Sequence, residues 1–194
     1  MSSTNRGAVR RAYDDYQTPR WAVRALLEHV KVSGTILEPC AGTRNIITEL
    51  ELRPLMPARV DRCEILEDRD FLDISWFESS GLFLPHYDWI ITNPPYSLAR
   101  EFIDRSLWLA DNIALLLRLS FLESKERLDW WQSRIPSALY VLASRPNFLD
   151  RQGNRVLNKQ GKPGVDSCSY AWFVWSKRYT GIYVIGAADM EGER

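Results

Sequence analysis

The sequence predicts an α/β protein with three layers, in which helices cover both faces of a mainly parallel sheet. Short apolar runs alternate with amphipathic stretches along most of the chain. A nearly all-apolar run at Ile113 to Leu119 is typical of a strand that is buried on both faces. Strands separated by helices form parallel sheets, because each helix carries the chain back to the edge where the previous strand began.

The first half of the chain predicts a helix followed by alternating strands and helices. Pro19 suits the first turn of a helix, and apolar residues then recur at helical spacing until Ser33 and Gly34. Strands are predicted over Thr35 to Glu38, Arg59 to Ile65 and Tyr87 to Thr92, with a helix from about Arg44 to Leu52.

The second half continues the alternation and then adds strands. Helices are predicted over Leu98 to Ala110 and Glu123 to Arg134, and strands over Ile113 to Leu119, Ala138 to Ala143, Tyr170 to Trp175 and Gly181 to Ile185. Residues 145–165 are rich in Asn, Gln, Gly, Lys and Arg without periodicity, which predicts a long mobile loop or an irregular hairpin that contacts substrate. We expect a single domain over residues 1–194.

Composition restricts the location and the partners of the protein. Lys and Arg number 25, as do Asp and Glu, so a nucleic-acid surface must come from local clustering of charge. Cys40, Cys63 and Cys168 match neither a zinc site nor a disulfide framework, which favours a reducing, cytoplasmic location. No membrane partner is expected, because no apolar run approaches the ~20 residues of a membrane span.

A rigid turn, Asn93-Pro94-Pro95-Tyr96, follows the predicted strand that ends at Thr92. Open α/β sheets bind ligands beyond the carboxyl ends of their strands, so we expect this turn to face substrate. Each proline restricts the residue before it to extended backbone, which fixes the Asn93 side chain and the Pro94 carbonyl in advance. The alternative is a stiff loop without function, although a chance match is on the order of one in a thousand at average proline usage.

Two fixed acceptors beside an aromatic ring suit chemistry on the exocyclic amine of a base. Adenine N6 is a poor nucleophile because its lone pair is delocalised into the ring. Hydrogen bonds from N6 to the Asn93 oxygen and the Pro94 carbonyl would localise the lone pair without a strong base or a metal ion, and Tyr96 offers a face for stacking. The segment resembles the catalytic motif of amino-methyltransferases, which include N6-adenine DNA enzymes, some RNA methyltransferases and protein-glutamine methylases.

The segment from Ile36 to Ile46 lies between the first strand and its helix, where a doubly wound fold binds a nucleoside cofactor. It resembles the S-adenosylmethionine motif of the same superfamily. The resemblance implies cofactor contacts from Glu38, Pro39, Ala41, Gly42 and Asn93. Glu38 would place negative charge near the cationic methionine end, and small residues would let the backbone approach the ligand. The family usually carries another glycine where this chain has Arg44. An ordinary turn between a strand and a helix is the alternative for this segment.

Carboxylates near the second strand extend this resemblance. Glu64 lies about twenty residues beyond the turn, where a carboxylate accepts hydrogen bonds from ribose hydroxyls. Asp70-Phe71 resembles the motif that borders the cofactor adenine. Only five residues separate Glu64 from Asp70, too few for the usual helix, so we expect the third strand of the family to be truncated or absent. An ordinary surface glutamate is the alternative for Glu64.

Two further segments resemble parts of DNA adenine methylases. Asp15-Tyr16-Gln17-Thr18-Pro19 resembles the segment that holds the methionine end of the cofactor, which implies contacts from Tyr16, Thr18 and Pro19. Phe148 follows a predicted strand, where these enzymes place an aromatic residue that stacks on the flipped base. Arg145, Arg151 and Arg155 supply positive charge for phosphates. The alternatives are a helix cap for Thr18, a core position for Phe148 and solvated loop charge.

The order of the motifs resembles that of short, phage-type N6-adenine DNA methylases. It implies a Rossmann-like methyltransferase fold whose sheet has an antiparallel strand near the C-terminus, S-adenosylmethionine as cofactor, DNA as partner, and no separate target-recognition domain. RNA adenine and a protein glutamine amide are alternative substrates. Arg44 and the short Glu64 to Asp70 spacing favour a rival, a binding-only homologue without turnover. A dinucleotide-dependent oxidoreductase fits less well, because the first turn lacks G-x-G-x-x-G spacing.

Overall fold

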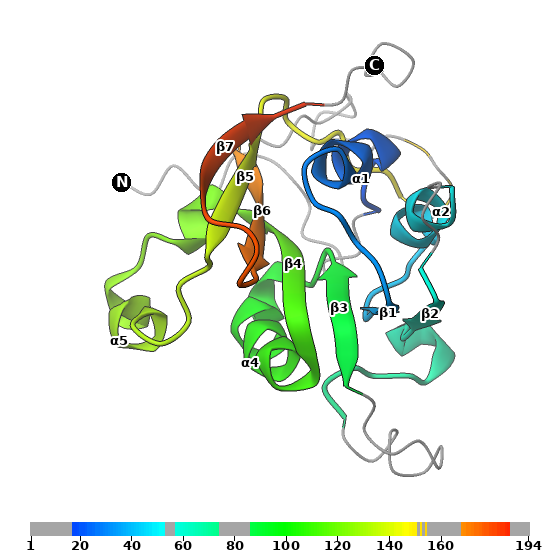
Figure 1. Ribbon diagram of the computed structural model, residues 1–194, viewed down its shortest axis with the longest axis horizontal. Coiled ribbons are helices and arrows are strands. Elements are labelled where there is room, and N and C mark those ends of the chain that lie inside the picture. The colour runs from blue at the N-terminus through cyan, green and yellow to red at the C-terminus, as the bar shows by residue number, and fades with distance from the viewer. Residues whose placement is uncertain are drawn as a thin grey trace.

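The computed structural model describes residues 17–52, 57–73, 86–150, 152, 154 and 168–186. Within them, one seven-stranded sheet has the order β2-β1-β3-β4-β6-β5-β7, which runs from right to left in Figure 1. β6 is antiparallel to both of its neighbours, and the other neighbouring pairs are parallel. The mostly parallel sheet with an antiparallel strand near the C-terminus, expected from the sequence, is confirmed.

The apolar runs locate the strands to within a few residues. The bounds are β1 Thr35–Glu38, β2 Arg59–Arg62, β3 Tyr87–Thr92, β4 Ala110–Arg118, β5 Ala138–Leu142, β6 Tyr170–Trp175 and β7 Gly181–Ile185. β4 begins earlier than predicted, because Ala110 and Asn112 continue the pairing with β3. β2 ends earlier, because the chain turns into a 3-10 helix at Ile65–Glu67.

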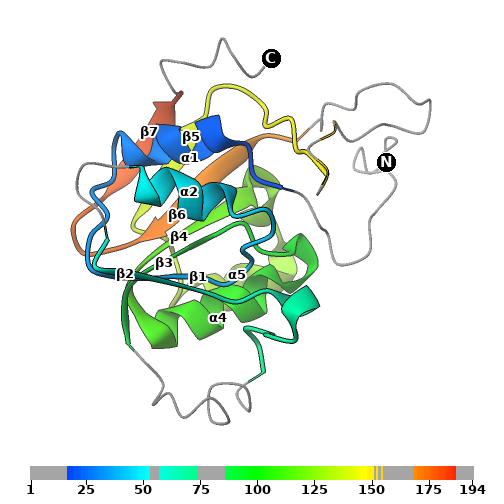
Figure 2. The same ribbon diagram turned by 90° about the vertical axis from the view of Figure 1, so that its right-hand side faces the viewer.

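Helices cover both faces of the sheet, as Figure 2 shows. On one face lie α1 (Arg20–Leu27) and α2 (Asn45–Glu51), and on the other lie α4 (Ala99–Leu109) and α5 (Leu128–Trp131). Because side chains alternate along a strand, neighbouring residues enter different cores. Ile36 packs on the α1 and α2 side, whereas Leu37 packs on the α4 and α5 side. The predicted three-layer α/β architecture is confirmed.

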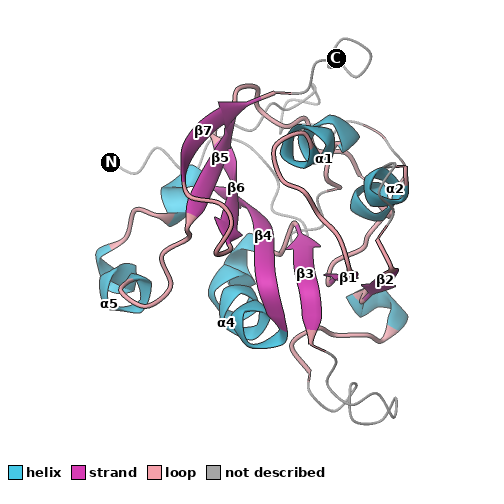
Figure 3. Cartoon of the chain, viewed as in Figure 1, coloured by secondary structure: helices cyan, strands magenta, loops and turns pink. Residues whose placement is uncertain are grey.

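Helices and strands alternate as far as β5, after which the described residues add only strands (Figure 3). The long helix predicted over Glu123 to Arg134 is wrong, since a 3-10 turn at Lys125–Arg127 leads into a short α5 that ends at Trp131. Pro136 follows closely and disfavours helical backbone in the residue before it. None of the helices that the structure describes is long and apolar enough to cross a membrane.

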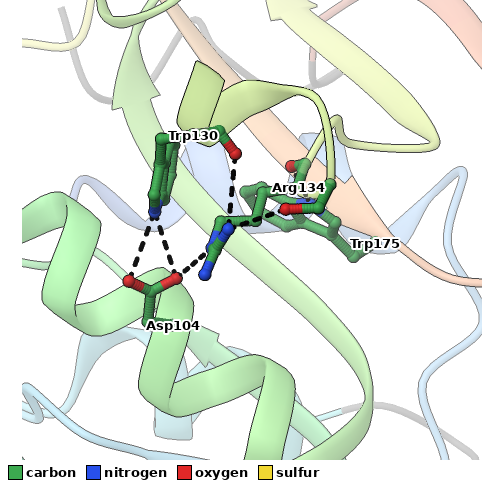
Figure 4. A network of polar contacts seen from close by, with 5 residues as sticks. Asp104, Trp130, Arg134 and Trp175 are labelled. Atoms are coloured by element: carbon green, nitrogen blue, oxygen red, sulfur yellow. Dashed lines mark hydrogen bonds and ion pairs between the residues drawn. The ribbon is translucent and has the colours of Figure 1, made fainter. Parts of the chain in front are cut away.

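Side chains, instead of further helical turns, hold the α5 segment in place (Figure 4). Asp104 of α4 accepts a hydrogen bond from Trp130 Nε1 at 3.2 Å and forms an ion pair with Arg134. The indole N–H of Trp175, at the end of β6, donates to the Arg134 carbonyl oxygen at 2.7 Å. These contacts fix the segment to α4 and to the sheet.

Candidate functional site

The sheet is built outward in two directions from β1 and β3. The chain passes from β1 through α2 to β2 on one side, and from β3 through α4 to β4 on the other. Open α/β sheets bind ligands at such a switch point, beyond the carboxyl ends of the strands. Leu37 pairs with Ile90, so the turn after Glu38 lies beside the turn at Asn93. The segments predicted to hold cofactor and substrate are thus brought together.

The Asn93 turn continues β3 directly toward α4. Thr92 ends the strand and is fully buried, Asn93 is half-buried, and Pro94 is buried. Pro95 has extended backbone with ψ of 121°, and its carbonyl oxygen accepts a hydrogen bond from the Leu98 N–H at 2.9 Å. The strand predicted to end at Thr92 is confirmed. The two prolines restrict their own backbone and that of the residue before each, so the turn after Thr92 has few available conformations.

Tyr96 begins a 3-10 turn, and its half-buried ring lies against Arg118 and Tyr170. The guanidinium carbon of Arg118 lies 4.9 Å from the Tyr96 ring centroid, and the Tyr170 ring centroid lies 5.8 Å from it. Arg118 Nε donates to the Tyr170 hydroxyl at 3.1 Å. Sequence reasoning missed both neighbours. The available signal was the charge of Arg118 at the end of an apolar strand.

Glu38 ends β1 and is 1 % exposed. The backbone N–H of Cys40 donates to Glu38 Oε1 at 3.4 Å, whereas Oε2 has no hydrogen-bond partner in the part of the chain that the structure describes. Burial raises the pKa of the Glu38 carboxyl well above its usual range, and the Glu64 carboxylate acts in the same direction. A buried carboxyl with an unused oxygen suits a ligand that brings positive charge or hydrogen-bond donors.

The turn after β1 is closely packed around Gly42. Gly42 has φ of +47°, and a Cβ atom at this position would lie 2.3 Å from Gln17 Oε1. Its N–H donates to Glu64 Oε2 at 2.7 Å, which joins the end of β2 to the turn. Glu64 is 6 % exposed, so it is not the surface glutamate that was its alternative. Pro39 and Ala41 of the same turn are buried.

Gln17 is a further residue that sequence reasoning missed. Its Oε1 accepts hydrogen bonds from the backbone N and the Oγ1 of Thr43, at 2.7 and 2.9 Å. Its backbone forms an antiparallel bridge with Leu149, with N···O distances of 3.0 and 3.4 Å. Gln17 therefore joins the turn after β1 to the segment after β5. Its sequence signal is its place inside the N-terminal motif, between Tyr16 and Thr18.

The neighbours of Gln17 in that motif lead into α1. Thr18 is buried, and its carbonyl oxygen accepts a hydrogen bond from Asn45 Nδ2 at 2.8 Å. Pro19 precedes the first helical residue with extended backbone, and no side chain caps the helix. Thr18 therefore does not act as the plain helix cap that was its alternative. Tyr16 lies outside the described residues.

Arg44, which stands where the family motif has glycine, adopts the left-handed backbone that favours glycine, with φ of +65°. Its guanidinium lies 3.9 Å from the carboxylate of Glu51, and both side chains are about half exposed. The Arg44 side chain thus extends along α2 toward solvent. The contact with Glu51 places the positive charge of Arg44 near the end of α2 instead of in the turn.

Asp70 and Phe71 follow Glu64 after a single 3-10 turn. Asp70 is half-buried, and its Oδ1 accepts a hydrogen bond from the Leu72 N–H at 2.9 Å. Phe71 is 1 % exposed, with its ring centroid 5.0 Å from that of Phe102 on α4. Phe71 therefore belongs to the core on the α4 side. Within the described ranges β2 is the strand at this edge of the sheet.

Phe148 contacts Tyr170 and belongs to the core on the α1 and α2 side, as its alternative of a core position implied. It is 7 % exposed, and its ring contacts that of Tyr170 with 5.1 Å between centroids. Tyr170 thus contacts both Tyr96 and Phe148, the two side chains expected to stack on a base. Arg145 is exposed shortly after β5. Arg151, Arg155 and most of the predicted loop at 145–165 lie outside the described residues.

The carboxyl ends of β1 and β3 are thus followed by a buried carboxyl, a glycine turn, and a rigid turn with an aromatic side chain. Such groups can hold a cation and orient an amine. Across the described ranges, no group of three or more His, Cys, Asp or Glu side chains is arranged to hold a metal ion.

No protein-family model and no curated protein matches the sequence. A protein assigned to the class I S-adenosylmethionine-dependent methyltransferases, from Listeria monocytogenes, is similar in structure. Its TM-score is 0.52 at 10 % identity, over 90 % of this chain and 67 % of that one. The methyltransferase subunit of a type I restriction-modification system from Streptococcus thermophilus also has a TM-score of 0.52, at 12 % identity over 89 % of this chain. This chain spans about half the length of that subunit, 48 %. The likeness confirms the predicted Rossmann-like methyltransferase fold.

Proposed function

We propose that the protein transfers a methyl group from S-adenosylmethionine to the exocyclic N6 of a DNA adenine that is flipped out of its stack. The observation that carries the proposal is the pairing of β1 with β3, which sets the Glu38 turn beside the Asn93 turn. A donor and an amine held at adjacent turns are close enough to react without further diffusion. The fold shared with a class I S-adenosylmethionine-dependent methyltransferase supports the choice of cofactor.

The residues after β1 and β2 fit S-adenosylmethionine. Glu38 would face the cationic methionine end with Oε2, the buried oxygen that has no partner among the described residues. Gly42 and Glu64, joined by their 2.7 Å hydrogen bond, form the side expected to receive the ribose. Further cofactor contacts proposed from the sequence are Tyr16, Thr18, Pro19 and Asp70. When bound, the cofactor supplies an electrophilic methyl group.

The Asn93 turn would prepare the amine. Asn93 Oδ1 accepts one N6 hydrogen and the Pro94 carbonyl oxygen accepts the other, so the nitrogen lone pair is directed toward the β1 side. Tyr96 stacks on the base and keeps it in plane with these acceptors. No strong base is needed, because N6 releases its proton to water after methylation has made it a cation.

The choice of DNA depends on the N-terminal motif, Phe148 and the basic residues after β5. The Gln17–Leu149 bridge supports it, because it joins the N-terminal motif to the segment that carries Phe148. One solved structure with the same fold is the methyltransferase subunit of a restriction-modification system, which is consistent with this choice. A cytoplasmic location is part of the same proposal.

The decisive experiment is transfer of a labelled methyl group by the purified full chain to unmethylated single- and double-stranded DNA, with N6-methyladenine identified by mass spectrometry. Asn93→Ala should lower transfer by about 100-fold or more, the effect of removing one oriented hydrogen bond from a reacting group. Asn93→Asp keeps an acceptor oxygen and should lose less. Gln132→Ala, at an exposed position just after α5, is the control that should leave transfer unchanged. Calorimetry must show that each variant binds the cofactor.

The remaining outcomes separate the alternatives. Transfer to RNA adenine or to a glutamine amide, with none to DNA, would replace the substrate and keep the site. Cofactor binding without transfer to any of them would identify a binding-only homologue. Absence of binding at millimolar cofactor would overturn the enzyme proposal altogether.

A further inference from the structure

We infer that Arg118 is a positioning residue, which holds one face of the Tyr96 ring and excludes the substrate base from that face. The role of the base rests on the proposed function, whereas the contact between Arg118 and Tyr96 does not. Neither the motifs nor the fold comparison assigns a role to this arginine.

The sheet itself fixes Arg118 in place. Arg118 is the last residue of β4 and pairs with Tyr170, the first residue of the antiparallel β6. The two residues are therefore a cross-strand pair at the ends of their strands. The 3.1 Å hydrogen bond from Arg118 Nε to the Tyr170 hydroxyl orients the guanidinium. Tyr96 lies in the turn that follows β3, the parallel neighbour of β4. Three adjacent strands thus determine where the ring and the cation meet.

The spacing decides which face of Tyr96 is available. A base stacks about 3.4 Å from each neighbouring plane, so a base between two planes needs about 7 Å. The Arg118 guanidinium carbon lies 4.9 Å from the Tyr96 centroid, which is too close to admit a base. Tyr170, tilted by 46° at 5.8 Å, packs against the same ring. A base that stacks on Tyr96 is therefore excluded from the face that Arg118 covers.

The contact also affects how well Tyr96 serves as a stacking surface. A guanidinium over an aromatic face is attracted to its electron-rich centre, so Arg118 restrains the ring. A restrained ring loses less rotational freedom when a base stacks on it. Loss of Arg118 should therefore weaken engagement of DNA and leave the Glu38 to Gly42 turn, on the other side of β3, unchanged.

Three substitutions test this role by steady-state methyl transfer to DNA. Arg118→Met keeps the aliphatic stem and removes the cation, and we expect kcat/KM for DNA to fall about 3- to 30-fold, the range that a cation–π contact spans. The Kd for S-adenosylmethionine should stay within about twofold. Arg118→Lys should recover part of the loss, and Tyr170→Phe should show a smaller loss. The control Arg105→Met removes a similar contact, 5.6 Å above Trp108 on α4, and should have no effect on transfer.

A second measurement does not require activity. In protein labelled with 3-fluorotyrosine, the ¹⁹F resonance of Tyr96 is assigned by its loss in Tyr96→Phe, and Arg118→Met should shift it. If the resonance stays in place, or if Arg118→Met weakens cofactor binding as much as DNA turnover, the inference is overturned. If the wild-type protein methylates nothing but Arg118→Met shifts the Tyr96 resonance, the positioning role is supported while the proposed function fails. Should Arg118→Met not fold, Arg118→Lys and Tyr170→Phe provide the same two readouts.

Discussion

Substitution of Gly42 by alanine should destabilise the protein by an amount that the local geometry allows us to estimate. The left-handed backbone at φ +47° costs a residue with a Cβ atom about 1–2 kcal/mol. The new Cβ would lie 2.3 Å from Gln17 Oε1, so the Gln17 side chain must leave and forfeit its two hydrogen bonds from Thr43. Each contributes about 0.5–1.5 kcal/mol. After about 0.4–1 kcal/mol is regained from a stiffer unfolded chain, the net loss is roughly 1–5 kcal/mol.

Urea unfolding followed by tryptophan fluorescence measures this loss, and a double-mutant cycle tests its cause. In a Gln17→Ala background the clashing oxygen is gone, so Gly42→Ala should cost only the backbone term less the same regain from the unfolded chain, roughly 0–2 kcal/mol. Gly181→Ala is the matched control, because Gly181 also has positive φ, +109°, but its nearest neighbour would lie 3.4 Å from the new Cβ. An equal cost of Gly42→Ala in both backgrounds would refute the reasoning.

Three other substitutions have definite expected outcomes. Arg44→Gly should raise the free energy of unfolding by about 1 kcal/mol, because it relieves a left-handed backbone at φ +65°; a lower melting temperature would contradict this. Glu49→Ala should lower that free energy by roughly 2–3 kcal/mol in urea unfolding, because it removes the buried carboxylate that Arg20 and Arg24 contact at 2.5 and 3.1 Å. A change below about 1 kcal/mol would show that solvent already screens these ion pairs. Burial raises the pKa of Glu38 above the usual glutamate pKa of 4.5. The wild type therefore loses stability as the pH rises from 4.5 through the pKa of Glu38 in the folded state. Glu38→Gln lacks this loss, so the variant should become increasingly more stable than the wild type from pH 5 to pH 8, while its affinity for the cofactor is lower. A constant difference in stability between the two proteins across that range would contradict the pKa argument.

The elements that the sequence predicted best are those whose information is local. β1, β3 and β6 have the predicted bounds, because a run of apolar residues ended by a turn needs no partner to be recognised. The Asn93 turn was found for the same reason, since its prolines restrict their own neighbours. The prediction of a long helix over Glu123 to Arg134 was wrong because the residues have helical spacing, but contacts with Asp104 and Trp175 determine the backbone.

The site residues that the sequence did not reveal depend on pairings between distant positions. Arg118 meets Tyr170 through the register of β4 with β6, and Gln17 meets Leu149 through a single bridge. Neither register can be read from the periodicity of one strand, because any slip by two residues keeps the same face buried. Phe71, which the motif implies as a cofactor contact, packs its ring against Phe102 in the core on the α4 side.

The two cores on opposite faces of the sheet have a consequence for how such a protein can diversify. The turn at Gly42 leads into α2, whereas the turn at Asn93 leads into α4. Tyr96 nevertheless packs against both cores, and Cys40, in the turn after β1, packs against the core on the α4 side. Effects of substitutions at residues in contact do not simply add, so repacking either layer should alter the surroundings of Tyr96. A mutant library intended to change what Tyr96 contacts should therefore sample both layers together.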